Sequence, residues 1–438
     1  MQNFNSTNFF KNKKCEYKDV LKNAQSFISN HYYSKLQSNN EKEQIKLYIN
    51  QFLIDERIEV DNLSQDELSN KLYREMAEYS FLTDYFNRSD IEEININAWN
   101  DIKIHYSNGD VKPSEEIFLS PDHAVDVIRR LLRESNMILD NSNPVVRGHL
   151  AKNIRITVIG RGVIDDDVGV VASIRFVNPK KLGREDFIKD EMMSEQMIDI
   201  IQQLYNYGIS MCLTGSTGTG KTTFMAWLMS TILDEKRLFT IEEDTREFDL
   251  VKKNEEGKII NNVIHTVTNK SKNIDQEKLL ELALTSDPDF ICVSEMKGSE
   301  AFAAQEAART AHTVITTTHA NSCDATYARM VTLCKTKYDM DDKTLYDLVT
   351  EAFPIVMFVK KLGRKRKFME IKECIIHEDG RRERQTLFKY EIKSAKRVNG
   401  KTEVTGEFKK INNISKQLQK RLIENGMPQS TLDKLLKS

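Results

Sequence analysis

The chain has 438 residues, more than one hydrophobic core usually holds, so we expect two or three domains. Charged residues make up 30% of the chain but nearly cancel to a formal net charge of −2, which excludes an overall basic field of the kind that binds nucleic acid. The six cysteines contain no C-x-x-C pair and no apolar run is long enough to span a membrane, so we expect reduced thiols and a cytosolic protein.

Two segments precede residue 181. Residues 1–75 are polar and rich in lysine, with apolar residues at helical spacing, and predict a helical lead-in. Residues 76–180 predict a mixed α+β domain, because alternating isoleucines suit paired strands and Ser107–Asp110 suits a tight turn. The elements expected in this domain are strands over 94–96, 102–106, 154–159 and 170–176 and an amphipathic helix over 121–133.

A linker is expected at Asn178–Leu182, and the domain behind it, residues 181–385, alternates strand-like with helical runs. Such alternation predicts an α/β fold, a parallel sheet with crossover helices. A helix around Met192–Tyr207 leads to the first strand of this core. Residues 386–438 predict a charged, helical, lysine-rich tail with a solvated face.

The sequence from Cys212 to Thr223 contains a complete G-x-x-x-x-G-K-[ST] phosphate loop, placed between a short apolar run and helix-forming residues. Glycines allow backbone N–H groups to converge on phosphates at the positive end of a helix. Lys221 supplies a mobile positive charge, and Thr222 offers a hydroxyl to Mg²⁺. The residues expected to bind ATP are Gly215, Ser216, Thr217, Gly218, Thr219, Gly220, Lys221, Thr222 and Thr223.

An apolar strand that ends in a carboxylate, Asp287–Glu295, has the form of a Walker B segment. A buried strand places Glu295 at the carboxyl edge of the sheet, where phosphates and Mg²⁺ bind in doubly wound folds. We therefore expect Glu295 to hold the metal through water or to orient the attacking water. The alternative is a carboxylate that caps the following turn.

A second acidic group, Glu242–Asp244, follows the strand-like run Leu238–Ile241. One of its carboxylates could align the attacking water or accept its proton, and a solvated acidic loop is the alternative. Farther along, His312 and His319 stand on either side of a threonine-rich strand. As hydrogen-bond donors beside the Walker B strand they could sense the γ-phosphate, whereas a lone histidine is more often structural.

Along the chain these four motifs follow one another as phosphate loop, acidic group, Walker B segment and histidines, and in that order they resemble those of the secretion ATPases of type II and type IV systems. The resemblance covers residues 75–385 and is greatest to the branch that serves conjugation machines and Tad-type pili. Four upstream motifs are similar to the amino-terminal domain of that family: D-I-E-E-I-N-I-N at Asp90–Asn97, N-P-V-V-R at Asn143–Arg147, N-I-R-I-T-V-I at Asn153–Ile159 and S-I-R-F at Ser173–Phe176.

The resemblance implies roles for individual residues. Gly215–Thr223 would be the nucleotide cradle, and the carboxylates at 242–243 and the two histidines would belong to the acidic and histidine boxes of the family. Arg155 and Arg175 match positions from which the family reaches the nucleotide phosphates, and would act as arginine fingers. Without the resemblance, both would be interpreted as surface arginines. The implied catalytic residues are Glu295, Glu242, Glu243, Arg155, Arg175, His312 and His319.

Three departures from the family pattern are present. The acidic box reads Glu-Glu-Asp-Thr-Arg-Glu, where the family has Glu-Asp and a shorter gap, so the sequence leaves open whether Glu242 or Glu243 is the base. Ser294 stands where glycine is usual. Lys297 stands where arginine is usual, and a lysine lacks the bidentate fork of a guanidinium group. None of these replacements removes a group that hydrolysis requires.

By resemblance, the chain is a Mg²⁺-dependent ATPase with a RecA-like P-loop core behind the α+β domain, and it forms a homo-hexameric cytoplasmic motor. It would associate with the inner face of the cell membrane, dock on inner-membrane platform proteins, and power a secretion, conjugation or pilus apparatus. One alternative is a nucleic-acid-translocating ATPase that uses Lys360, Lys361 and the run 364–367, although the glycine before that run favours an exposed hairpin. Another is a nucleotide-gated scaffold whose altered acidic box no longer supports hydrolysis.

Overall fold

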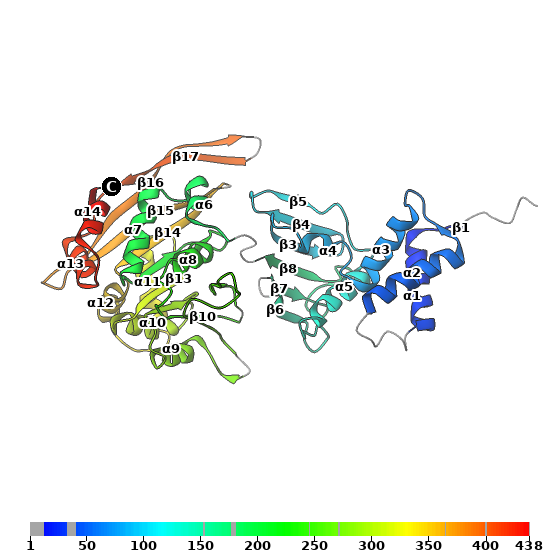
Figure 1. Ribbon diagram of the computed structural model, residues 1–438, viewed down its shortest axis with the longest axis horizontal. Coiled ribbons are helices and arrows are strands. Elements are labelled where there is room, and N and C mark those ends of the chain that lie inside the picture. The colour runs from blue at the N-terminus through cyan, green and yellow to red at the C-terminus, as the bar shows by residue number, and fades with distance from the viewer. Residues whose placement is uncertain are drawn as a thin grey trace, which may run out of the picture. The chain divides into compact units, whose positions relative to one another are not determined.

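The computed structural model describes residues 13–32, 41–151, 154–176, 181–244, 246–269, 272–363, 365–398 and 401–437. The chain divides into two compact units, Met1–Pro179 and Lys180–Ser438 (Figure 1). Most of the expected linker Asn178–Leu182 lies outside the described residues. The domain boundaries expected at residues 75, 180 and 385 remain predictions.

Helices form the amino-terminal part of the first unit and enclose a small core of their own. This confirms the helical spacing of the lead-in. The third helix begins after Ser64, whose hydroxyl accepts a hydrogen bond from the backbone N–H of Glu67 in a capping box. The elements are β1 (Lys13–Lys14), α1 (Tyr17–Tyr32), α2 (Glu41–Glu56), β2 (Ile58–Glu59) and α3 (Gln65–Ala77).

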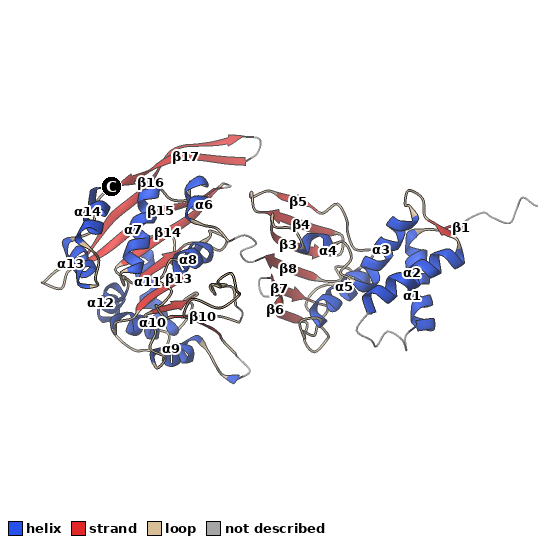
Figure 2. Cartoon of the chain, viewed as in Figure 1, coloured by secondary structure: helices blue, strands red, loops and turns tan. Residues whose placement is uncertain are grey.

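A six-stranded antiparallel sheet forms the rest of the first unit, in the order β5-β4-β3-β8-β7-β6 (Figure 2). Its buried isoleucines pack on α5 (Pro121–Arg133), a helix that has the predicted bounds. The predicted strands are also confirmed, although Asn153 lies outside the described residues. The remaining elements are β3 (Ile91–Ala98), β4 (Asp101–Tyr106), β5 (Val111–Pro113), β6 (Val145–Ala151), β7 (Ile154–Ile159), β8 (Val171–Phe176) and α4 (Leu82–Phe86).

A nine-stranded sheet organises the second unit, in the order β11-β10-β12-β13-β9-β14-β15-β16-β17. The first six strands are parallel and the last three are antiparallel to their neighbours. The strands are β9 (Met211–Thr214), β10 (Leu238–Glu242), β11 (Val263–Val267), β12 (Phe290–Val293), β13 (Thr313–Thr318), β14 (Ile355–Leu362), β15 (Lys365–Ile376), β16 (Arg382–Val398) and β17 (Lys401–Lys410).

Helices cover both faces of this sheet, which explains why its central strands are buried along their whole length. One face packs on α7, α8, α13 and α14, and the other on α9 to α12. The α/β class is confirmed. The helices are α6 (Arg184–Lys189), α7 (Glu195–Asn206), α8 (Lys221–Ser230), α9 (Gln276–Leu284), α10 (Glu300–Arg309), α11 (Cys323–Cys334), α12 (Asp342–Ala352), α13 (Lys416–Glu424) and α14 (Gln429–Lys437).

The expectation of a helical tail with a solvated face after residue 385 is confirmed only for its last two helices, α13 and α14, and is wrong about strands and burial. Strands β16 and β17 extend the large sheet, and α13 and α14 bury leucines such as Leu418, Leu422 and Leu432 in its core. Charged partners on the strands, such as Lys409 and Glu391 at 2.6 Å, obscure the strand alternation in the sequence. Of the helices in the described ranges, none combines the length and apolar character needed to cross a membrane.

Candidate nucleotide site

The phosphate loop lies between the end of β9 and the start of α8, as the motif predicts. Its glycines adopt conformations with positive φ, namely 145° at Gly215, 76° at Gly218 and 90° at Gly220. A Cβ atom on Gly215 would lie 2.2 Å from the carbonyl oxygen of Val359 on β14. Only glycine therefore fits at this point, where the loop begins to turn toward the positive end of α8.

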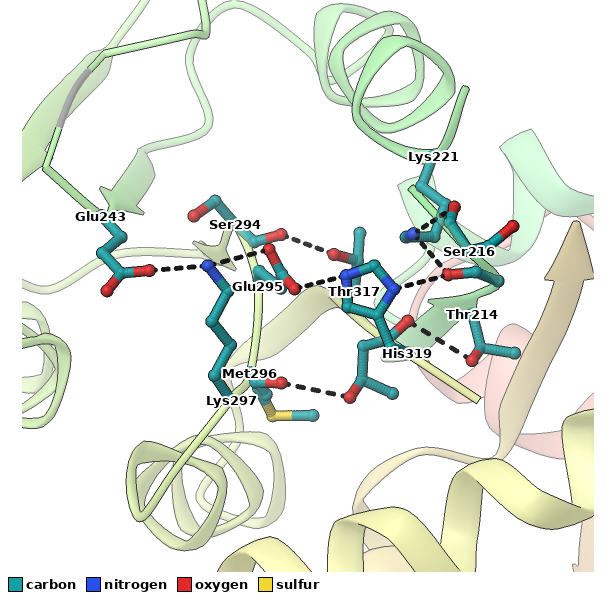
Figure 3. A network of polar contacts seen from close by, with 12 residues as sticks. Thr214, Ser216, Lys221, Glu243, Ser294, Glu295, Met296, Lys297, Thr317 and His319 are labelled. Atoms are coloured by element: carbon teal, nitrogen blue, oxygen red, sulfur yellow. Dashed lines mark hydrogen bonds and ion pairs between the residues drawn. The ribbon is translucent and has the colours of Figure 1, made fainter. Parts of the chain in front are cut away.

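Lys221 folds back onto the loop that precedes it (Figure 3). Its Nζ donates hydrogen bonds to the carbonyl oxygens of Gly215, at 2.6 Å, and Ser216, at 3.1 Å. The hydroxyl of Thr219 donates to the same Ser216 carbonyl at 2.8 Å. The lysine is 7% exposed, so its charge is held close to the loop rather than extended into solvent.

His319 joins the phosphate loop to the Walker B carboxylate (Figure 3). Its Nε2 lies 2.7 Å from Oε1 of Glu295, and its Nδ1 lies 2.9 Å from the carbonyl oxygen of Gly215. Carboxylates and carbonyls accept hydrogen bonds, so the ring can satisfy both neighbours only when both nitrogens carry a proton. Through its two ring nitrogens, His319 thus connects the segment after β12 to the end of β9.

The threonines of β13 hold the segment that follows β12. The hydroxyl of Thr317 donates to the carbonyl of Ser294 at 2.8 Å (Figure 3), and that of Thr318 donates to the carbonyl of Met296 at 3.1 Å. These contacts fix the backbone on both sides of Glu295. They give the threonine-rich strand a positioning role next to the carboxylate.

Lys297 links Glu243 and Glu295, which are 52 positions apart in the sequence. Its Nζ lies 2.7 Å from Oε2 of Glu243 and 3.2 Å from Oε2 of Glu295 (Figure 3). Burial alone would lower the pKa of Lys297, but the hydrogen bond and charges of these carboxylates outweigh it and raise the pKa above its ordinary value. The lysine therefore remains cationic between them.

Glu242 has a different environment from its neighbour Glu243. Its side chain is 1% exposed and accepts hydrogen bonds from the backbone N–H groups of Glu247 and Phe248, the latter at 2.9 Å. Burial raises the pKa of Glu242 to about 7. Glu242 closes the loop that follows β10, in which Thr245 lies outside the described residues. Of the two candidate bases, Glu243 is the one connected to Glu295 through Lys297.

The structure does not bring His312 to the phosphate loop. It precedes β13, at the amino edge of the sheet, where its Nδ1 lies 2.8 Å from the carbonyl oxygen of Pro288. His319 follows the same strand, so the two histidines are about 20 Å apart at the rise of a β-strand. The proposed catalytic role of His312 gains no support from its position within this chain.

Arg155 and Arg175 belong to the first unit. They lie directly opposite each other on β7 and β8. Their neighbours Ile156 and Ile174 turn inward to the core beneath α5, so the two arginines occupy the other face of the sheet, where Arg175 is exposed. Two guanidinium groups thus share one polar surface.

Arg366 reaches the phosphate loop, a placement that the sequence did not predict. Its Nε donates to the carbonyl oxygen of Gly218 at 2.9 Å, and its Cδ would lie 3.3 Å from a Cβ atom on Gly220. The next residue, Lys367, is 2% exposed and donates to Glu191. The expected exposed basic hairpin is therefore wrong for these two residues, and Arg364 lies outside the described ones. The basic run in the sequence does not indicate which side chains turn inward.

The family described as type II/IV secretion system protein matches residues 163–431, more than half of the chain. The chain belongs to this family. The resemblance stated from the motifs is confirmed, but the matched range begins later than residue 75 and continues past residue 385. It therefore includes β16, β17 and α13.

Curated proteins similar to this type II/IV secretion family member include the conjugal transfer protein TrbB of Rhizobium radiobacter, 24% identical over 60% of this chain and 77% of TrbB. The type IV secretion system protein PtlH of Bordetella pertussis is 28% identical over 43% of this chain and 57% of PtlH. Among solved structures, the ATPase DotB of Legionella pneumophila is 19% identical, with a TM-score of 0.49 over 82% of this chain and 86% of DotB.

Proposed function

We propose that this chain hydrolyses ATP with Mg²⁺. The observation that carries the proposal is the continuous set of contacts from the phosphate loop through His319 to Glu295, and from there through Lys297 to Glu243. A phosphate held by the loop and a carboxylate beside it are the two elements that positioning catalysis of phosphoryl transfer requires. Fold class alone would not support this function.

The residues of the loop fit the nucleotide. Gly215–Thr223 would hold the phosphates, because the positive φ angles of its glycines turn the backbone at the start of α8. Lys221 would exchange its present carbonyl partners for phosphate oxygens. Arg366 would hold the tip of the loop through the Gly218 carbonyl. The α- and β-phosphates are common to ADP and ATP, so both nucleotides would fit this loop.

The donor set also fits Mg²⁺. Within the described part of the chain, no three His, Cys, Asp or Glu side chains gather into a metal-binding group. Mg²⁺ in nucleotide sites usually takes one or two protein ligands and completes its shell with phosphates and water. Thr222 on α8 and Glu295, through water, would provide these ligands. When bound, the ion would neutralise charge on the phosphates.

Glu295 is assigned the task of orienting the attacking water, and His319 that of positioning Glu295. Lys297 would hold Glu243 and Glu295 in one network, with Glu243 the candidate second acid. Arg155 and Arg175 would neutralise charge on the departing phosphate, as the family pattern implies. Glu242 would support the loop after β10 rather than contact the nucleotide.

Family membership supports a proposal for the biological role. We propose a homo-hexameric motor of RecA type in the cytoplasm, docked on inner-membrane platform proteins, that powers a type IV secretion, conjugation or Tad-type pilus apparatus. The similarity to a conjugal transfer protein and to a type IV secretion system protein supports this choice. The nucleic-acid alternative loses support, because Arg366 and Lys367 of its basic cluster contact other parts of the second unit.

Steady-state phosphate release by the full chain with ATP and Mg²⁺ tests the proposal. We expect Glu295→Gln and Lys221→Ala each to lower turnover by about a hundredfold or more, because each removes a group that acts on the reacting phosphate. Glu281→Gln removes the same charge from an exposed pair with Lys278 on α9 and should retain turnover. Sedimentation of the same samples measures the expected hexamer.

Three outcomes would contradict the proposal. If Glu295→Gln turned over ATP as fast as the wild type, Glu295 would not be the Walker B acid. Turnover that requires added DNA would favour the nucleic-acid motor, and nucleotide binding without phosphate release in a confirmed oligomer would favour the scaffold.

A further inference from the structure

The turn between α6 and α7 is joined to strand β15 by Glu191. The Glu191 carboxylate lies 2.7 Å from Nζ of Lys365 and 3.1 Å from Nζ of Lys367, and the Glu191 carbonyl oxygen accepts a further hydrogen bond from Lys367. The hydrogen bonds from the two lysines lower the pKa of the Glu191 carboxyl group, so the residue is an anion near neutral pH. One acidic residue thus binds two positions of one strand.

The backbone at Glu191 has a conformation that is unfavourable for a residue other than glycine. Its φ is 53°, in the left-handed region, and such a conformation persists only where surrounding contacts hold it. The hydrogen bond from Lys367 to the Glu191 carbonyl is one such contact. The backbone N–H of Phe368 donates to the carbonyl of Met192 at 3.0 Å and is another. Side chains and backbone together therefore fix this turn to β15.

Arg366 lies between the two lysines and points in the other direction. Successive side chains of a strand point to opposite faces, so Lys365 and Lys367 point together to Glu191 while Arg366 points away. The Nε of Arg366 donates to the Gly218 carbonyl of the phosphate loop at 2.9 Å. Because Glu191 restrains the strand on both sides of Arg366, it limits the positions from which the guanidinium group can reach the loop.

Met192 brings the same turn to the phosphate loop. A Cβ atom on Gly220 would lie 3.4 Å from Cε of Met192 and 3.3 Å from Cδ of Arg366. Met192 is also buried in the core of the second unit. The turn and the strand that Glu191 joins therefore each place a side chain next to Gly220.

We infer that Glu191 is a positioning residue for the nucleotide site and acts on it through Arg366. The inference rests on the proposed function, because it takes the phosphate loop to bind a nucleotide. The connection runs from the Glu191 carboxylate through Lys365 and Lys367 to β15, and from Arg366 to the Gly218 carbonyl. Loss of the Glu191 carboxylate should therefore weaken nucleotide binding and leave the groups around Glu295 in place.

Calorimetric titration of the full chain with ADP tests the inference without hydrolysis. Glu191→Gln should weaken ADP binding by about three- to tenfold, less than Arg366→Ala, because it acts on the loop only through the strand. In steady-state phosphate release it should raise KM by a similar factor and change kcat by less than about twofold. Glu185→Gln removes the same charge from an exposed pair with Arg184 on α6 and should bind ADP like the wild type.

A double-mutant cycle separates positioning from a general loss of structure. In the Arg366→Ala background, Glu191→Gln should weaken ADP binding no further, because the hydrogen bond from β15 to Gly218 is already absent. Thermal melts verify that the variants are folded. If Glu191→Gln does not fold, Lys365→Gln takes its place: it leaves the buried Lys367 on Glu191 and should weaken ADP binding by a smaller factor.

Three results would overturn the inference: wild-type ADP binding by Glu191→Gln, or by Lys365→Gln where it is the variant used; an equal loss in Glu185→Gln; and a further loss in the Arg366→Ala background. Absence of ADP binding by the wild-type chain would overturn the proposed function, and this inference with it.

Discussion

Glu242 is a carboxyl group closed inside the protein, and its burial should make stability depend on pH. Its pKa rises from 4.5 to about 7 on folding. Between these values the folded state binds more protons than the unfolded state, so the free energy of unfolding falls as pH rises. For one group, the slope reaches up to about 1.4 kcal/mol per pH unit. Above about pH 7 this contribution levels off.

Urea unfolding of the wild type and Glu242→Gln across this window measures the effect. From pH 5 to 7 the free energy of unfolding of the wild type should fall relative to that of Glu242→Gln, because glutamine does not titrate. Glu243→Gln retains Glu242 and should keep the wild-type slope. Parallel pH profiles for the wild type and Glu242→Gln would show that the burial of Glu242 does not shift its titration.

Arg366 should set the affinity of the phosphate loop for nucleotide. It restrains the loop tip through the Gly218 carbonyl, and a hydrogen bond from a charged group contributes about 1.5–3 kcal/mol. Arg366→Ala should therefore weaken ADP binding by about tenfold or more, measured by calorimetry. Lys361 lies opposite Arg366 in the β14–β15 ladder and is exposed, so Lys361→Ala is the matched loss of charge. Equal losses in the two variants would mean that net charge alone matters.

A site residue could be predicted from the sequence when it follows a parallel strand of the sheet. Glu295, His319 and the loop glycines follow strands directly, and the ends of parallel strands meet at one edge, so their order in the sequence was enough to bring them together. His312 precedes its strand and lies at the opposite edge. Arg366 comes from an antiparallel strand whose register the motifs do not encode.

At the scale of elements, α13 is part of the core rather than a solvated tail. Leu422 is fully buried against the large sheet, whereas the next residue, Ile423, is 38% exposed. Leu422→Ala should lower the free energy of unfolding by about 2–5 kcal/mol, because it leaves a cavity. Ile423→Ala should change it far less. Denaturant unfolding measures both, and a neutral Leu422→Ala would return α13 to the status of a peripheral helix.

Helix prediction was accurate where amphipathic spacing is strong and capped. The bounds of α5 were predicted correctly because Ser120 caps it and proline begins it, with apolar residues along one face. In α13, lysines and glutamines surround a few buried leucines, so the composition of the segment concealed its core face. In β16 and β17, cross-strand ion pairs put charges where a strand pattern would be sought.

At the scale of the whole chain, the family range 163–431 begins in the first unit and ends within α14. The sequence predicted a helical lead-in, an α+β domain, an α/β core and a tail in series, whereas the structure divides into two compact units. It did not predict that the last fifty residues complete the sheet of the second. The strand that leads into the phosphate loop, the strand that carries Arg366 and the C-terminal strands consequently belong to one sheet.

The lysine of the phosphate loop gives the site an internal competitor. While Lys221 is bound to the carbonyls of Gly215 and Ser216, its ammonium occupies partners that it must release before it can serve an incoming phosphate. The apparent affinity for nucleotide is then the intrinsic affinity multiplied by the fraction of molecules in which Lys221 has released these carbonyls. Any contact that weakens the hydrogen bonds between Lys221 and these carbonyls would raise the affinity for nucleotide without contacting the nucleotide. The backbone conformation of the loop therefore tunes nucleotide occupancy.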